Sequence, residues 1–328
     1  MSGYPGRVSA LTYSTLTGRL IVANLVVQIV IIATGGAVRL TGSGLGCSSW
    51  PNCEPGEFSP QFHAASSIHP YVEWGNRLMG AVVVIVALAV AVLVFFAARR
   101  GVRPPPSGRL LWLATVPLLL SLVQAVLGGL TVVLHLHPAV VGSHFLFSAA
   151  LVWISTWLVI EWYRPGPGRP AVSPRLRTVG WALAAVAAVV VVFGMLVTGS
   201  GPHSGDDEVG YRFALDPVLI ARVHAGAVWV FVAVLVLFLL LTFRPADDGA
   251  GQRRVVRRRG VVLLGVTLAQ GAIGYVQYFT GLPELLVGIH MIGAALLLVA
   301  TAWTVAGMSE RASRAELTTG ADAVPAAH

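Results

Sequence analysis

The sequence contains very few charged residues and no lysine at all. Only 11% of its 328 residues are charged, whereas 56% are hydrophobic and the mean hydropathy is +0.78. Soluble domains carry about 25% charged residues, so this composition excludes a soluble globular protein and indicates the lipid bilayer. The net charge of +8 does not indicate a nucleic-acid partner, because all 22 basic residues are arginines that cluster between apolar runs.

Long apolar runs are abundant where charge is scarce. Eight of them reach the length of about 20 residues that a membrane-spanning helix needs. We therefore expect an all-α integral membrane protein with eight transmembrane helices. The expected spans are 20–38, 73–97, 110–134, 138–162, 179–199, 217–243, 260–280 and 284–307.

The arginines are distributed unevenly between the two sides that these spans define. Eighteen of the 22 fall on the side of the termini, and the other four, Arg39, Arg77, Arg212 and Arg222, lie on or near the opposite side. Arginine concentrates in cytoplasmic segments of membrane proteins. This bias predicts a multi-pass protein with both termini in the cytoplasm.

The two halves of the chain repeat each other. Residues 124–151 align without a gap with residues 270–297, which places His144 on His290, and the segment TGSG recurs at 41–44 and 198–201. The repeat predicts two pseudo-symmetric four-helix bundles in the same orientation. We expect an N-terminal half at 1–162, a linker at 163–178, a C-terminal half at 179–308 and a disordered tail at 309–328.

Cysteine is nearly absent. Cys47 and Cys53 flank SSWPN in the long loop at about 41–72, on the side opposite the termini. Two close cysteines facing an oxidising compartment normally pair. Both a structural disulfide and a redox-active one fit this spacing.

Three of the nine histidines lie inside expected spans, at positions 144, 224 and 290. Each lies six or seven residues from the start of its helix, which is roughly 10 Å deep at 1.5 Å per residue. Two opposed imidazoles on His224 and His290 would suit a haem, whereas a metal ion without haem is less favoured because no Cys or carboxylate joins them. The alternative is that each histidine hydrogen-bonds a neighbouring helix.

The N-terminal half breaks this symmetry. Asn76 stands where the repeat has His224, and Glu73 precedes it by one helical turn. An amide is a poor iron ligand, whereas a carboxylate at the edge of a cavity can move protons or hold a water. This half is therefore predicted to hold an exchangeable ligand, although Glu73 could also be an interfacial charge paired with Arg77 or Arg39.

Three arginines, Arg39, Arg77 and Arg222, occur near the same level as the histidines. Guanidinium groups there could clamp carboxylates such as haem propionates. Snorkelling of these side chains to the interface is the alternative.

Several of these motifs resemble the haem A synthase family, and its actinobacterial branch in particular. The resemblance covers the chain from the first span to the last, and it rests on GGAVRLTGSGLGCSSWPNC (35–53), EWGNRL (73–78), LGGLTVVL with His144 ten residues on, RVHAG and GIHMIGAALL. It implies an enzyme of a bacterial cell membrane that oxidises the C8 methyl group of haem O to the formyl group of haem A by successive hydroxylations.

The resemblance also implies roles for individual residues. His224 and His290 would be axial ligands of a haem b, His144 a ligand of the substrate haem O, and Glu73 the carboxylate of the reaction site. The cysteines would be the outer-loop pair of the family. Asn76 departs from the family pattern, which leaves ligation by one histidine or a substitute ligand such as His69.

The resemblance implies partners as well. The substrate would be haem O, and the protein partners would be haem O synthase and cytochrome oxidase assembly factors. Membrane lipid would surround the spans. A homo-oligomer is also compatible with the sequence. Two rival functions remain: a di-haem cytochrome for quinol-linked electron transfer, and a haem carrier without catalysis.

Overall fold

The computed structural model describes residues 5–61, 67–243 and 250–322. Within these ranges, eight helices are long and apolar enough to cross a membrane, which confirms the all-α eight-span prediction. The apolar runs form helices because a helix satisfies all its backbone polar groups internally in lipid. The spanning helices are α1 (Pro5–Leu40), α2 (His69–Phe96), α3 (Gly108–Val133), α4 (Pro138–Tyr163), α5 (Pro174–Ser200), α6 (Pro217–Phe243), α7 (Ala250–Phe279) and α8 (Glu284–Ala306).

Local signals fix most of the helix starts. Proline occupies the first turn of α2, α4 and α5, where its missing N–H costs nothing. The Ser107 side chain caps α3 by accepting from the Leu110 N–H at 3.1 Å. The first and seventh helices begin earlier than predicted, because polar and arginine-rich segments continue both helices beyond the apolar run.

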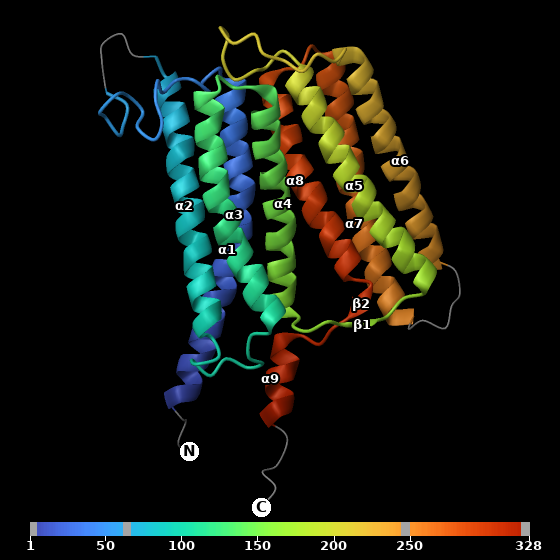
Figure 1. The fold of residues 1–328 in the computed structure, drawn as a ribbon. Helices are drawn as coiled ribbons and strands as arrows, with labels where there is room; N and C mark the ends of the chain where they lie inside the picture. Colours follow the sequence, from blue (N-terminus) through green and yellow to red (C-terminus); the bar gives the residue numbers. More distant parts are fainter. Residues whose placement is uncertain (1–4, 62–66, 244–249, 323–328) are drawn as a thin grey trace, which may run out of the picture.

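Each half is a ring of four helices. In the first half every helix packs against its two neighbours in the order α1–α2–α3–α4, and the second half repeats this order with α5–α6–α7–α8. This places α2 diagonally opposite α4, and α6 diagonally opposite α8. Figure 1 shows the two halves side by side. The pseudo-symmetry of the two bundles stays a prediction.

The two rings meet along a continuous apolar seam. Helices α1 and α4 contact α8, and α4 also contacts α5. The buried side chains of this seam are Ile32, Ala149, Val152, Val191, Ala295 and Leu298. The halves therefore share a core.

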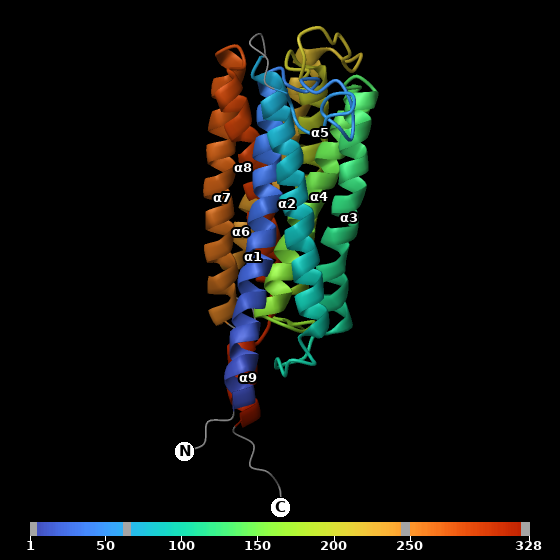
Figure 2. The same ribbon diagram turned by 90° about the vertical axis from the view of Figure 1, so that its left-hand side faces the viewer.

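The two ends of the bundle differ. The first helix begins, and the last helix ends, at what we call the terminal end, whereas the loop that carries the cysteines lies at the opposite end, the disulfide end (Figures 1 and 2). At the disulfide end, the Gly44 N–H donates to the Gly205 carbonyl at 2.6 Å and joins the loops of the two halves. The assignment of the terminal end to the cytoplasm stays a prediction.

The segment after α8 differs from the disordered tail expected from its composition. Strand β2 (Ser309–Glu310) pairs antiparallel with β1 (Arg169–Pro170) in the linker, and α9 (Arg314–Asp322) follows. Arg314 anchors this helix: its Nε donates to the Trp162 carbonyl at 2.7 Å, and its guanidinium lies 4.1 Å from the Trp162 ring. Burial lowers the pKa of Arg314 to about 10, so the side chain remains charged at neutral pH. Residues 323–328 of the expected tail lie outside the described residues.

A buried carboxylate near the end of α4 holds the linker and the tail together. Glu161 is 0% exposed and accepts from Arg311 at 3.1 Å and from the Gly166 N–H at 2.9 Å. Arg109 of α3 lies 3.5 Å from the same carboxylate. These contacts explain why the segment after α8 is ordered at the terminal end.

Candidate functional site

One cavity connects the two halves. Its volume is about 1540 Å³, and all eight spanning helices contribute to its lining. Typical small-molecule sites measure about 300–1,000 Å³, so this cavity has room for more than one ligand. It brings together eight of the residues predicted to bind haem or to act on it, namely Arg39, Glu73, Asn76, Arg77, His144, Arg222, His224 and His290.

Two of the three histidines, His144 and His290, occupy corresponding places in the two rings. His144 lies on α4, diagonal to α2, while His224 and His290 lie on α6 and α8, which are diagonal to each other. A diagonal pair of helices can present side chains from opposite sides of the ring centre. Among the described residues, only the C-terminal ring has a cavity-lining histidine on both helices of that pair, because His69 of α2 does not line the cavity.

A glycine on the adjacent helix makes space for each histidine ring. A Cβ atom built on Gly128 would lie 3.4 Å from Cε1 of His144, and one on Gly274 would lie 3.3 Å from Cε1 of His290. The third ring, that of His224, faces Gly194 of α5 in the same way at 3.2 Å. Because glycine lacks a side chain, each ring can lie close against the next helix.

Two glutamines hold the backbone at matching histidines. The Gln124 side chain donates to the His144 carbonyl at 2.9 Å, and Gln270 donates to the His290 carbonyl at 3.0 Å. Both pairs are separated by 20 residues, as the sequence repeat requires. Hydrogen bonds of this kind around a ligand fix its orientation.

No hydrogen bond at Nδ1 joins any of these three histidine rings to a neighbouring helix among the described residues. The Nδ1 atoms of His144, His224 and His290 are all buried and have no hydrogen-bond partner among the described residues. An unsatisfied buried polar atom costs about 1–3 kcal/mol. At this nitrogen, therefore, the three histidines do not bond a neighbouring helix. Imidazoles that line a large cavity fit a haem iron.

Asn76 has a different environment from the histidines. Its Oδ1 lies 2.7 Å from the Thr34 hydroxyl on α1, and a Cβ atom built on Gly35 would lie 3.8 Å from the same oxygen. The amide lines the cavity on α2, diagonal to His144 on α4. The position of the missing histidine is thus filled by a shorter side chain tethered to α1.

Glu73 is buried at the disulfide end of the cavity. Only 4% of the residue is exposed, and its Oε2 accepts from the Cys47 N–H at 2.8 Å. Its Oε1 accepts from Nη2 and Nε of Arg77, at 2.6 and 3.2 Å. The carboxylate lines the cavity and is paired with Arg77, so the ion pair is present, while the role of Glu73 in moving protons or holding a water stays a prediction.

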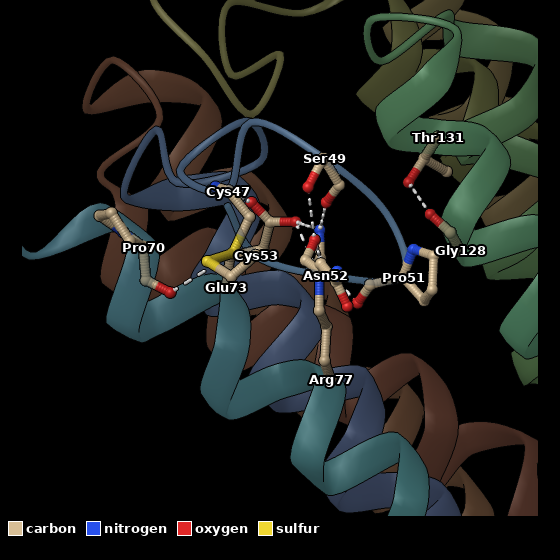
Figure 3. Close-up of polar contacts among 10 residues, drawn as sticks. All are labelled: Cys47, Ser49, Pro51, Asn52, Cys53, Pro70, Glu73, Arg77, Gly128 and Thr131. Atoms are coloured by element: carbon tan, nitrogen blue, oxygen red, sulfur yellow. Dashed lines mark hydrogen bonds and ion pairs between the residues drawn. A yellow bond between two sulfur atoms is a disulfide. The ribbon is translucent and has the colours of Figure 1, made fainter. Parts of the chain in front are cut away.

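The loop between the cysteines is docked on the same arginine, as Figure 3 shows. Arg77 donates to the carbonyls of Ser49, Pro51 and Asn52 at 3.0, 3.3 and 3.0 Å. A disulfide joins the two cysteines of this loop. Within the loop, Trp50 packs directly on Gly129 of α3, where a Cβ atom would lie 2.5 Å from the indole.

The other two cavity arginines differ from Arg77. Arg39 extends across the seam and donates from Nη2 to the Thr198 carbonyl of α5 at 2.7 Å, while its buried Nε has no partner among the described residues. Arg222 is exposed at the cavity wall. His69, the suggested substitute ligand, is not among the cavity-lining residues and lies 2.9 Å from the Ser43 hydroxyl.

Sequence patterns gave no role to several residues of the site. Trp50 and Thr34 carry no distinctive spacing, and their contacts cross between segments that are distant in sequence. The repeated pair Gln124 and Gln270 did carry a signal, because each aligns with the other and lies 20 residues before a histidine.

Comparisons with known proteins agree on one family. A model of the family described as COX15-CtaA, cytochrome oxidase assembly protein, matches residues 18–202. The chain is 29% identical over 331 residues to a protein named Heme A synthase from Caulobacter sp. (strain K31), covering 87% of this chain and 93% of that protein. It is 29% identical over 279 residues to a Heme A synthase from Symbiobacterium thermophilum, covering 80% and 87%. A Heme A synthase from Bacillus pumilus is 35% identical over 139 residues, 41% of this chain and 42% of that protein.

Proposed function

The chain belongs to the COX15-CtaA family of cytochrome oxidase assembly proteins, and from this premise we propose that it is a haem A synthase, a membrane oxidoreductase that converts haem O to haem A. The reaction would oxidise the C8 methyl group by two successive two-electron hydroxylations, each of which needs an external oxidant and an oxygen atom, and the resulting geminal diol would lose water to give the formyl group. The observation that carries this proposal is the shared cavity, where three histidines and a buried carboxylate meet in a chain that resembles heme A synthases along most of its length.

The C-terminal half supplies the resident cofactor site in this proposal. His224 and His290 would hold haem b, because they lie on diagonal helices and each ring is positioned by a facing glycine. Bound there, haem b would supply one-electron transfer. With both imidazoles bound to its iron, this haem would leave no place for a further ligand.

The N-terminal half supplies the reaction site. His144 would ligate the substrate haem O, and Glu73 would hold or move a proton at its carboxylate oxygens. The contacts from Arg77 and the Cys47 N–H fix the carboxylate at the cavity wall, and a carboxylate has lone pairs left for a water. Arg39, with its unpaired buried Nε, and Arg222 are suited to bind the haem carboxylates.

The test is to express the chain in a bacterium that makes haem O but no haem A, and to extract the pigments from its membranes. We expect haem A with the wild-type chain and none with Glu73→Gln, which keeps the size of the side chain but removes its charge. Retention of haem b in the Glu73→Gln protein is the control for folding.

The same extraction separates the rival functions. A haem carrier would bind haem O and leave its C8 methyl group unchanged. A di-haem cytochrome would hold two permanent haems and give no haem A. Either result with a folded wild-type protein would contradict the proposed enzyme.

A further inference from the structure

The two diagonal helices of the N-terminal ring present different side chains to the cavity. In the C-terminal ring, the diagonal helices α6 and α8 both present an imidazole to the cavity. In the N-terminal ring, α4 presents His144, but α2 presents the amide of Asn76. Imidazole suits iron, whereas an amide carbonyl suits harder cations.

The Asn76 side chain is also hydrogen-bonded to a neighbouring helix. Its one side-chain hydrogen bond among the described residues is the 2.7 Å contact with Thr34, on the adjacent helix α1. The Thr34 hydroxyl has a single proton, and the Ile31 carbonyl lies 3.2 Å from it as a second acceptor. The amide therefore either accepts from Thr34 and turns its NH₂ group to the cavity, or donates to Thr34 and turns its oxygen there. In both arrangements one polar group of the amide remains for a ligand in the cavity.

The other strong iron ligands near the cavity are already engaged. His69 is bonded to Ser43 and does not line the cavity. The sulfurs of Met195 and Met291 do line it, but they pack into the spaces at Gly142 and Gly36, between helices of the two halves. Asn76 is thus the residue that the repeat places opposite His144, on the diagonal helix of the N-terminal ring.

We propose that the N-terminal haem position has one protein ligand, His144, and that its Asn76 face is an open binding site for a small iron ligand of the class of water and the diatomic gases. The Asn76 amide, positioned by Thr34, is the hydrogen-bonding partner of that ligand. The polarity and the hydrogen-bond donors on the open face of a haem decide whether such a ligand is bound or activated. This inference rests on the proposed function, because it assumes that haem O occupies the N-terminal half.

The test uses carbon monoxide as the probe on the reduced, purified holoprotein, with haem O or haem A content measured by pigment extraction on the same sample. We expect the N-terminal haem to bind carbon monoxide and the C-terminal haem b not to bind it. Asn76→His should abolish this binding with no loss of extracted haem.

Two further variants test the amide itself. Asn76→Leu should retain carbon monoxide binding but shift the C–O stretching frequency, because the polar partner is lost. Thr34→Val should give a smaller shift in the same direction, because the amide stays but is no longer tethered. An unchanged frequency in Asn76→Leu would overturn the role of the amide.

The outcomes separate the inference from the function on which it rests. If the wild-type protein forms haem A but no haem binds carbon monoxide, the open site is refuted and the proposed enzyme stands. If neither haem O nor haem A is extracted from wild-type protein loaded in a host that makes haem O, the proposed function fails and the open site fails with it.

Discussion

The arginine that joins the buried Glu73 carboxylate to the disulfide loop provides a sharp prediction. The guanidinium of Arg77 donates five hydrogen bonds, two to Glu73 and three to loop carbonyls. The Arg77→Ala variant would remove all five and leave a buried carboxylate without its counter-charge. Side-chain exposure is 19% for Arg77 and 6% for Glu73, so the pair is shielded from water.

The magnitude follows from this burial. Removing one partner of a buried ion pair costs about 3–5 kcal/mol. Since each 1.4 kcal/mol is a factor of ten, local opening of the loop should become about two to three and a half orders of magnitude more frequent. The Cys47 N–H reports this opening directly, because it donates to the Glu73 carboxylate.

The assay is hydrogen–deuterium exchange of the Cys47 amide in detergent-solubilised protein. Arg175→Ala is the matched control, because that arginine is exposed in the first turn of α5, at the terminal end. The double variant Glu73→Gln with Arg77→Ala should exchange more slowly than Arg77→Ala alone, because the unpaired charge is gone. An Arg77→Ala exchange rate within about tenfold of wild type would refute the reasoning.

Three further predictions concern the cofactor, the substrate position and the tail. His290→Ala should abolish the low-spin haem b spectrum, whereas His203→Ala, outside the cavity, should leave it intact; equal spectra would contradict the ligand assignment. Gly128→Val should displace the neighbouring histidine ring and reduce bound haem O without loss of haem b, and Gly265→Val, which faces open space, should change neither. Arg314→Ala should remove about 1.5–3 kcal/mol of stability per charged hydrogen bond and expose α9 to limited proteolysis. Unchanged protection of this helix would count against Arg314 as its anchor.

The sequence predicted the spans well because they depend on composition alone. Apolar runs of the necessary length must form helices in lipid, so all eight were found, and six of them began within about five residues of the expected position. The starts of α1 and α7 were missed because helix formation continues into polar segments where hydropathy gives no signal.

The ordered segment after α8 illustrates what composition misses. Residues 309–322 read as a polar tail, yet Arg314 and Arg311 bind carbonyls and a carboxylate of segments about 150 residues earlier. Such order depends on a buried acceptor, Glu161, whose burial cannot be deduced from sequence. A small number of charge-assisted bonds is sufficient to fix the segment.

The site was predictable in its residues but not in its connections. The internal repeat identified His144, His224, His290 and Asn76, because a copied position that changes chemistry is visible in an alignment of the halves. The tether from Thr34 to Asn76 joins two helices whose relative rotation the sequence does not define. The glutamines that align in the repeat make the same hydrogen bond in both halves, from the glutamine side chain to the carbonyl of the aligned histidine.

The unequal roles of the two halves are tested most directly by the haem content of three purified proteins. Pigments would be extracted and quantified from wild type, His224→Ala and His144→Ala, each produced in a host that makes haem O. The account predicts haem b together with haem O or haem A in wild type, selective loss of haem b in His224→Ala, and selective loss of haem O and haem A in His144→Ala. Equal loss of both pigments from either folded variant, or full haem A formation by His144→Ala, would contradict it.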